Sequence, residues 1–173
     1  MRRLKVAESV ISIVANVTVI GALVVALLSY FAQIEQTRRT ASFDVISRLN
    51  SGEMLVVQRS LGRAVAQLQL KDLAGQVLPR DMMATLIAQL EETSADPLGF
   101  RQDVVTLVNY FDDAQICVET RTCDAEVMRG SLAETARRYA CLLTPYVLDI
   151  RQEQLLDGLG DGLGRMVDYE TSC

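Results

Sequence analysis

A small polar cluster holds the residues of this chain that best suit acid–base or cation chemistry. Asp112 and Asp113 follow Asn109 by three and four positions, a spacing that places the three side chains on one side of a helix. Arg151, further along the chain, carries the opposite charge. Carboxylates near a helix pair can bind a cation or transfer protons, whereas acids that face an arginine of a neighbouring helix usually form a structural hydrogen-bonded pair. We predict the structural role for this cluster.

The composition excludes several other chemistries. The sequence contains no histidine, so catalytic triads and proton relays that use imidazole are excluded, as are most zinc sites. The repeated Asp157-Gly-Leu-Gly and Asp161-Gly-Leu-Gly segments lack the ligand ladder and the closing glutamate of a calcium loop. Phosphate-binding glycine loops, nucleophile elbows and kinase signatures are also missing from the sequence. We therefore predict no catalytic residue, no metal site and no cofactor, and expect that the chain is not an enzyme.

The charge balance argues against nucleic acid as a partner. The chain after residue 9 keeps 14 of the 17 basic residues but 21 of the 22 acidic residues. Binding to phosphate backbones needs a surplus of clustered lysine and arginine. We expect protein or lipid partners.

Four cysteines leave two alternatives open. Cys117 and Cys123 form a C-x5-C spacing, which fits no zinc ribbon, redox motif or haem attachment site. In an oxidising compartment the two can pair across a short helix-to-loop segment. In the cytoplasm buried free thiols are expected, and this is the more common situation. Cys173 is expected to be an exposed chain end.

An uncharged apolar segment runs from Val10 to Phe31. Its 22 residues span about 33 Å as a helix, which matches a hydrocarbon core of roughly 30 Å. A cleaved signal peptide would have a shorter apolar core and a small-residue cleavage site. We therefore predict a retained transmembrane helix, with a basic flank before it and Tyr30 and Phe31 in an interfacial aromatic belt.

One side of this predicted span collects small residues. They are spaced by three, four or seven positions. They comprise Ala15, Thr18, Ala22, Ala26 and Ser29. Small side chains let two transmembrane helices approach closely, so this side is predicted to pack against another copy or against other membrane subunits. The alternative is that alanine is simply common in apolar helices.

The rest of the chain has the periodicity of an all-α protein. Apolar residues recur at three and four positions, and no convincing strand pattern is present. We predict the following organisation: a basic flank over 1–9, the transmembrane helix over 10–31, a stalk helix over 32–50, a soluble helical bundle over 51–156 and a flexible tail over 157–173.

Local signals set the expected helix ends within the bundle. Asp96 followed by Pro97 predicts the start of a long helix, and Asn50-Ser51-Gly52 predicts the end of the stalk. A short helix from Cys123 to Arg129 is expected to stop at Gly130, and a new helix is expected to begin at Ser131. Pro145 is expected to kink or restart that last helix.

Several short patches resemble a group of uncharacterised bacterial membrane proteins whose soluble part is a domain of unknown function. The patches are Gln33–Thr40, Leu107–Val118, Cys123–Glu126 and Leu143–Val147 with Arg151. The resemblance implies a cytoplasmic helical domain and supplies no activity, substrate or catalytic residue.

The orientation in the membrane rests on two opposing signals. The basic residues before and after the span nearly balance, with a slight preference for a cytoplasmic N-terminus and an external domain. The resemblance favours a cytoplasmic domain on the inner membrane, and this is our expectation, with a periplasmic domain as the alternative. A disulfide between Cys117 and Cys123 would contradict the cytoplasmic expectation.

These observations lead to two functional hypotheses. The first is a membrane-anchored interaction or accessory protein, a small subunit or assembly factor of a membrane complex, whose partners are the lipid bilayer, other membrane subunits or a second copy. The alternative is a tethered helical domain that senses a ligand or signal. The second hypothesis requires a pocket of roughly 300 Å³ or more.

Overall fold

The computed structural model describes residues 2–67 and 79–169, with the side chains of the first helix described from Asn16 onward. All regular structure in these ranges is helical, so the predicted all-α fold class is confirmed. The helices are α1 (Arg2–Leu49), α2 (Gly52–Gln67), α3 (Arg80–Thr93), α4 (Pro97–Glu119), α5 (Ala125–Gln154) and α6 (Asp161–Val167).

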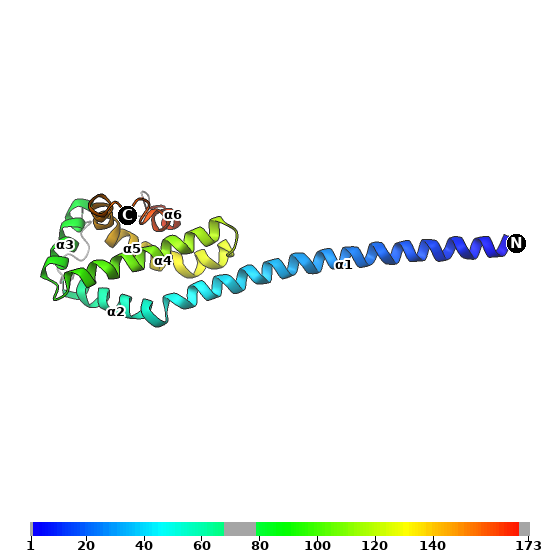
Figure 1. Cartoon of the computed structure of the whole chain (residues 1–173), viewed down its shortest axis with the longest axis horizontal. Coiled ribbons are helices and arrows are strands. Elements are labelled where there is room, and N and C mark those ends of the chain that lie inside the picture. The colour runs from blue at the N-terminus through cyan, green and yellow to red at the C-terminus, as the bar shows by residue number, and fades with distance from the viewer. Residues whose placement is uncertain (1, 68–78, 170–173) are drawn as a thin grey trace.

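The first helix gives the molecule its elongated shape. α1 extends far beyond the other helices, which gather around its C-terminal part (Figure 1). Its large apolar side chains from Val17 to Phe31 are each 51–65% exposed. Within the described residues, α1 is the one helix whose length and apolar composition would allow it to cross a membrane, a property that an N-terminal leader would share.

The helical bundle is built around α4. Its buried side chains recur at three and four positions, and they are Phe100, Val104, Leu107, Val108, Phe111 and Ala114. α4 packs against α2, α3, α5 and α6. Its N-terminus has the predicted form, because the Asp96 carboxylate accepts a hydrogen bond from the Gly99 N–H at 3.0 Å and Pro97 occupies the first turn.

α5 is one helix where the sequence predicted two. It begins with Asp124 as its N-terminal cap and continues through Gly130, Ser131 and Pro145 to Gln154. Its buried residues form a single stripe, comprising Met128, Leu132, Ala136, Ala140, Leu143, Val147 and Ile150. A glycine costs a helix only about 1 kcal/mol and an internal proline about 3 kcal/mol. Burial of this continuous stripe on both sides of the two residues offsets those costs, so the predictions of a stop and a restart are wrong.

The predicted flexible tail is wrong for most of its length. α6 packs against α4 and α5, and Leu159 and Leu163 are buried there. Gly158 and Gly160 have φ angles of +88° and +84°, a region that glycine enters without strain. The two glycines thus form a turn that returns the chain to the bundle. Residues 170–173, including Cys173, lie outside the described residues.

Gly162 should be the residue of α6 that is least tolerant of a side chain. A Cβ atom at this position would lie 2.6 Å from the Cα atom of Asp112, whereas one at Gly164 would meet nothing within 4 Å. We expect Gly162→Ala to lower the free energy of unfolding by about 1–3 kcal/mol because one backbone must move. Gly164→Ala, the matched control, should be neutral or slightly stabilising. Thermal unfolding and amide hydrogen exchange over 159–167 would measure both effects, and equal effects would contradict the close packing.

Candidate functional site

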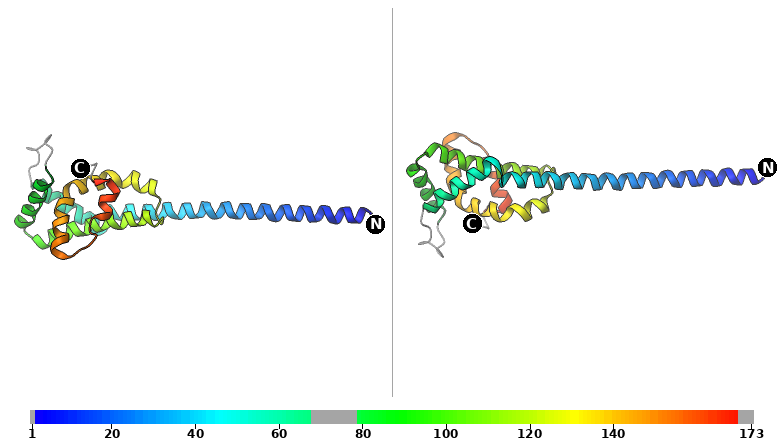
Figure 2. Two further views of the ribbon diagram at one scale, coloured as in Figure 1. Left: turned by 90° about the horizontal axis from the view of Figure 1, so that it is seen from above. Right: turned by 90° about the horizontal axis from the view of Figure 1, so that it is seen from below.

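The C-terminal part of α1 meets the turn between α4 and α5, and we call this contact the junction. The α4–α5 tip lies alongside α1 in all views (Figures 1 and 2). Ser42 of α1 is fully buried there. Its Oγ atom donates to the Arg38 carbonyl oxygen at 2.9 Å and accepts from the Asp124 N–H at 2.8 Å. The Ser42 hydroxyl therefore links α1 to Asp124, the residue that caps the N-terminus of α5.

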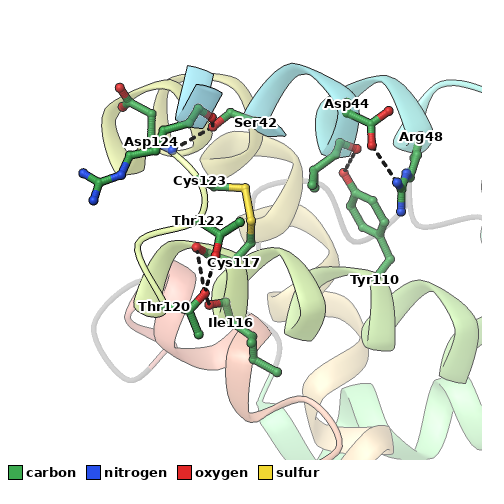
Figure 3. The surroundings of a disulfide bond; sticks show 12 residues. Ser42, Asp44, Arg48, Tyr110, Ile116, Cys117, Thr120, Thr122, Cys123 and Asp124 are labelled. Atoms are coloured by element: carbon green, nitrogen blue, oxygen red, sulfur yellow. Dashed lines mark hydrogen bonds and ion pairs between the residues drawn. A yellow bond between two sulfur atoms is a disulfide. The ribbon is translucent and has the colours of Figure 1, made fainter. Parts of the chain in front are cut away.

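A disulfide closes the turn at the junction. Cys117, in the last turn of α4, is bonded to Cys123 with a Cα–Cα distance of 5.2 Å (Figure 3). The N–H groups of Thr122 and Cys123 both donate to the Cys117 carbonyl oxygen at 3.0 Å. Arg121 at the tip has a φ angle of +59°. Cys141 on α5 is also disulfide-bonded, so the expectation of buried free thiols is wrong for all three described cysteines.

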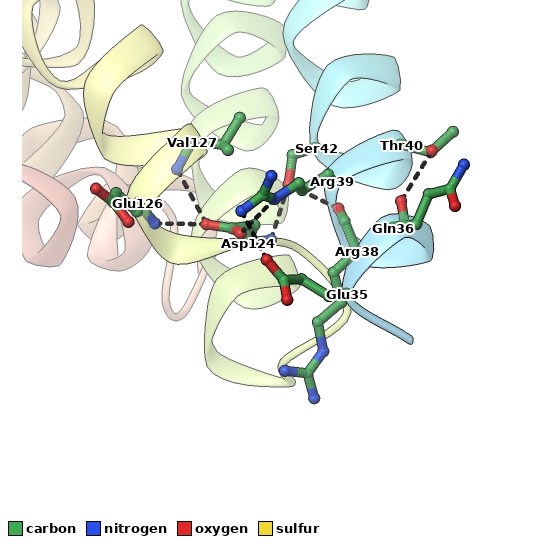
Figure 4. A network of polar contacts seen from close by, with 9 residues as sticks. All are labelled: Glu35, Gln36, Arg38, Arg39, Thr40, Ser42, Asp124, Glu126 and Val127. Carbon is green, nitrogen blue, oxygen red and sulfur yellow. Dashed lines mark hydrogen bonds and ion pairs between the residues drawn. The ribbon is translucent and has the colours of Figure 1, made fainter. Parts of the chain in front are cut away.

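The cap of α5 carries a negative charge toward α1. The Asp124 carboxylate accepts from the Glu126 and Val127 N–H groups at 2.9 and 3.1 Å, and the Arg39 guanidinium lies 3.7 Å away (Figure 4). The bond from the Val127 N–H is the main reason that the pKa of Asp124 is lowered, and the charge of Arg39 adds to it. The carboxylate is therefore ionised at neutral pH and complements α1 electrostatically.

Tyr110 makes a second polar contact between α1 and α4. Its hydroxyl donates to the Val45 carbonyl oxygen at 2.8 Å (Figure 3). Burial raises the pKa of Tyr110 to about 12, so the hydroxyl stays protonated and remains a donor. Because Val45 is already inside α1, this bond uses the second lone pair of a helical carbonyl and stabilises the packing of α4 on α1.

A cleft opens on the junction at the end nearest the apolar part of α1. It has a volume of about 470 Å³. Tyr30, Ile34, Thr37 and Arg38 line it from α1, and Arg121 and Thr122 line it from the turn. The cleft therefore has Tyr30 and Ile34 toward the exposed apolar surface of α1, and Arg38 and Arg121 also line it.

The predicted polar cluster is not a single site. Asp112 accepts from the N–H groups of Gly160 and Leu163 at 2.7 and 2.9 Å, so it holds the turn before α6. Arg151 pairs with Asp161 at 2.7 Å, whereas Asn109 and Asp113 are exposed. Asp112 and Arg151 therefore each contact the start of α6 through different partners and do not pair with each other. No group of three ligating side chains suited to a metal ion occurs in the ranges that the structure describes.

A buried charged network lies at the other end of the bundle and was not found in the sequence. Glu91 of α3 receives two hydrogen bonds from the Arg101 guanidinium, at 2.7 and 3.2 Å, and one from the Tyr146 hydroxyl at 2.6 Å. A further nitrogen of Arg101 bonds to Glu153 at 3.1 Å. Glu91 lies four positions after the buried Ile87. The signal in the sequence was that Glu91 occupies a position where the helical spacing of the apolar residues places a buried side chain.

This network borders a surface cleft of about 410 Å³ that is also lined by Pro97 and Asp149. The volume is above the limit that the ligand-sensing hypothesis requires. That hypothesis stays a prediction, and a ligand-dependent rise in Tm is the measurement that tests it.

The predicted transmembrane packing side lies on one continuous helix. Thr18, Ala22, Ala26 and Ser29 fall in the exposed, apolar part of α1, and Ala15 is on the same helix just before the described side chains. Helical spacing places the four described residues on one side of α1. Contact with another helix through this side stays a prediction.

Comparison with known proteins identified one family. A family described as a domain of unknown function (DUF4760) matches residues 16–155, which cover the apolar part of α1 and the bundle as far as the end of α5. No curated protein sequence and no solved structure matches the chain.

The Glu91 network gives a prediction about pH. Burial alone raises the pKa of Glu91, but the hydrogen bonds from Arg101 and Tyr146 outweigh it, and the net pKa is below the ordinary value of 4.5. A carboxylate with a lowered pKa stabilises the fold above its unfolded pKa, and this stabilisation is lost as the pH falls through the folded pKa. We expect Glu91→Gln to lower the free energy of unfolding at pH 7 by about 2–3 kcal/mol, because Arg101 loses its partner.

Urea unfolding of the full chain in detergent, followed between pH 7 and pH 3, measures this difference. The wild type and Glu91→Gln should converge toward the acid end. Glu92→Gln removes the same charge from an exposed neighbour and serves as the control, with little expected effect. A difference between Glu91→Gln and wild type that stays constant with pH would show that the ionised carboxylate is not the stabilising group.

Proposed function

This chain belongs to the family described as a domain of unknown function (DUF4760), and we propose that it is a membrane-anchored interaction protein. In this proposal it serves a membrane complex as a small subunit or assembly factor and has no catalytic activity of its own. α1 anchors it in the cell membrane, and the helical bundle presents the surface that partners contact.

The exposed apolar surface of α1 is the observation that carries this proposal. From Val17 to Phe31 the large apolar side chains on every side of the helix are exposed. Exposure of apolar surface to water costs about 25 cal/mol per Å², and a helix that is apolar all round is normally buried in protein or lipid. None of the span candidate is buried by the described part of the chain, so lipid is the solvent that we propose for it.

The small-residue side of α1 supports association within the membrane. Packing replaces the hydrophobic effect as the driving force between helices in lipid, and small side chains allow close approach. Ala22, Ala26 and Ser29 lie on one side of an unbroken helix. We propose this side as the contact with a second copy or with another membrane subunit.

The disulfide supports a domain on the oxidising side of the membrane. Cytoplasmic thiols are kept reduced, whereas disulfides persist in exported domains. The bonded pair Cys117–Cys123 therefore favours the periplasmic alternative over the cytoplasmic expectation. Arg2, Arg3 and Lys5 before the span are consistent with an N-terminus that stays in the cytoplasm. The proposed topology is thus a cytoplasmic N-terminus and an external bundle.

Charges placed in the apolar part of α1 should release the protein from the membrane. Leu23→Arg with Leu27→Arg should disfavour insertion by about 5–7 kcal/mol, since each arginine near the centre of a span costs about 2.5–3.5 kcal/mol. The matched control is Leu98→Arg with Leu148→Arg, which adds the same charge at two exposed positions in the bundle. Carbonate extraction and flotation with lipid would measure retention. A wild-type chain that stays in the aqueous fraction, or that is shortened at the apolar segment, would overturn the anchor.

The proposed topology predicts the state of the junction cysteines in cells. After acid quenching and denaturation, a maleimide should not label Cys117 or Cys123 of the wild type until a reductant is added. Cys117→Ser should add one labelled thiol, located at Cys123 by peptide mass spectrometry, because its partner is gone. If both cysteines of the wild type are labelled without reductant, the domain lies in a reducing compartment and the external topology is wrong.

A further inference from the structure

We propose that the junction cleft binds the phosphate group of an anionic phospholipid. This inference rests on the membrane anchor proposed above, because it places the cleft at the surface of the bilayer. It adds a ligand class and a site to that proposal.

The cleft carries two positive charges that form no ion pair within the described part of the chain. Arg38 and Arg121 line it from α1 and from the turn. Among the described residues, no carboxylate forms an ion pair with either guanidinium, although the charge of Arg38 is felt by Asp124. Glu35, Glu119 and Asp124, close to them in sequence, already have other partners. Guanidinium groups bind phosphate with two parallel hydrogen bonds, which makes a pair of them a suitable anion site.

Three acids near the cleft have partners of their own. Glu35 pairs with Arg39 at 2.6 Å, and Glu119 pairs with Arg165 of α6 at 2.9 Å. The Asp124 carboxylate accepts two N–H groups of the first turn of α5. Two arginines therefore remain to attract an external anion (Figure 4 shows Arg38 directed away from the Arg39–Asp124 pair).

The order of groups along α1 matches the order of groups in a phospholipid at the bilayer surface. Tyr30 and Ile34 stand at the apolar end of the cleft, and Arg38 stands one helical turn beyond Ile34. Arg38 lies about 10 Å past Phe31 along the helix axis, and the headgroup layer extends roughly 5–8 Å beyond the hydrocarbon core. A long arginine side chain can cover the remaining distance. Acyl chains can then lie on α1 while the phosphate contacts the arginines.

The turn that carries Arg121 is held in place before any ligand binds. Its backbone has a left-handed conformation that a non-glycine residue rarely adopts, and such conformations often occur at functional sites. The Cys117–Cys123 disulfide closes the turn, and the bond from Asp124 to Ser42 fixes it to α1. A site formed in advance loses less conformational entropy when it binds.

The test titrates the full chain in dodecyl maltoside micelles with phosphatidylglycerol and with phosphatidylcholine, and counts retained lipid by native mass spectrometry. We expect the wild type to prefer phosphatidylglycerol. Arg38→Gln with Arg121→Gln should weaken that binding by roughly 25-fold, about fivefold for each arginine near the membrane surface. Arg59→Gln with Arg63→Gln removes two exposed arginines of α2 and should leave binding unchanged. Arg38→Lys with Arg121→Lys keeps the charge but loses the two parallel hydrogen bonds, so it should recover only part of the affinity.

Further measurements distinguish a failure of the proposed lipid site from a failure of the proposed membrane anchor. Unchanged Tm values in all three double variants would show that the bundle is intact. Equal loss in the α2 control and in the cleft variant, or equal retention of the two lipids by the wild type, would overturn the site. Displacement of the lipid by inorganic phosphate would show a site for free phosphate and would overturn lipid recognition. Flotation with neutral vesicles tests the anchor alone, since the cleft variant should still float if the anchor holds.

Discussion

One unbroken helix has to satisfy two different surroundings. From Val17 to Phe31, α1 is apolar and exposed on every side, whereas from Ser42 to Leu49 it buries one side against the bundle. The backbone hydrogen bonds run through both parts, so the rotation of one part about the helix axis fixes the rotation of the other. The position of the bundle around the proposed span therefore follows from the packing of about two turns of α1.

Buried polar groups decide how those turns pack. A buried hydroxyl or carboxylate is costly unless it has a hydrogen-bond partner. Ser42 meets this requirement only where the Asp124 N–H approaches α1, and Glu91 meets it only beside Arg101 and Tyr146. A shift of α1 by one residue would turn Ser42 by about 100° and leave the Asp124 N–H without it. Apolar side chains alone would tolerate such shifts more easily.

The two ends of the bundle carry different kinds of charge. At the end away from the apolar helix, Arg101 forms ion pairs with the carboxylates of Glu91 and Glu153. Its positive charge is therefore compensated within the protein. At the junction, the acids pair elsewhere and leave Arg38 and Arg121 beside an aromatic and apolar surface. The proposed lipid site depends on this asymmetry, since a bilayer surface offers phosphate groups to the junction end alone. The disulfide at the same end fixes the turn that carries one of the two arginines.

The sequence alone determined the features that depend on local spacing. Apolar periodicity indicated an all-α chain, Asp96 and Pro97 marked the start of α4, and the uncharged length from Val10 to Phe31 identified the apolar part of α1. Local rules did not determine α5 or α6, because both depend on distant residues. The stripe that continues past Gly130 and Pro145 is stabilised by burial against α3 and α4, and the turn before α6 is held by Asp112, about 50 positions earlier.

The polar contacts show the same division. The partners of Asp112, Glu91 and Ser42 could not be predicted from the sequence, since a hydrogen bond between residues far apart in the chain depends on how the helices pack. The tertiary structure decided that Asp112 holds a turn, that Glu91 pairs with Arg101, and that Arg38 and Arg121 line one cleft. It also decided the pairing of Cys117 with Cys123, which spacing left open, because only the fold sets the distance between their Cα atoms.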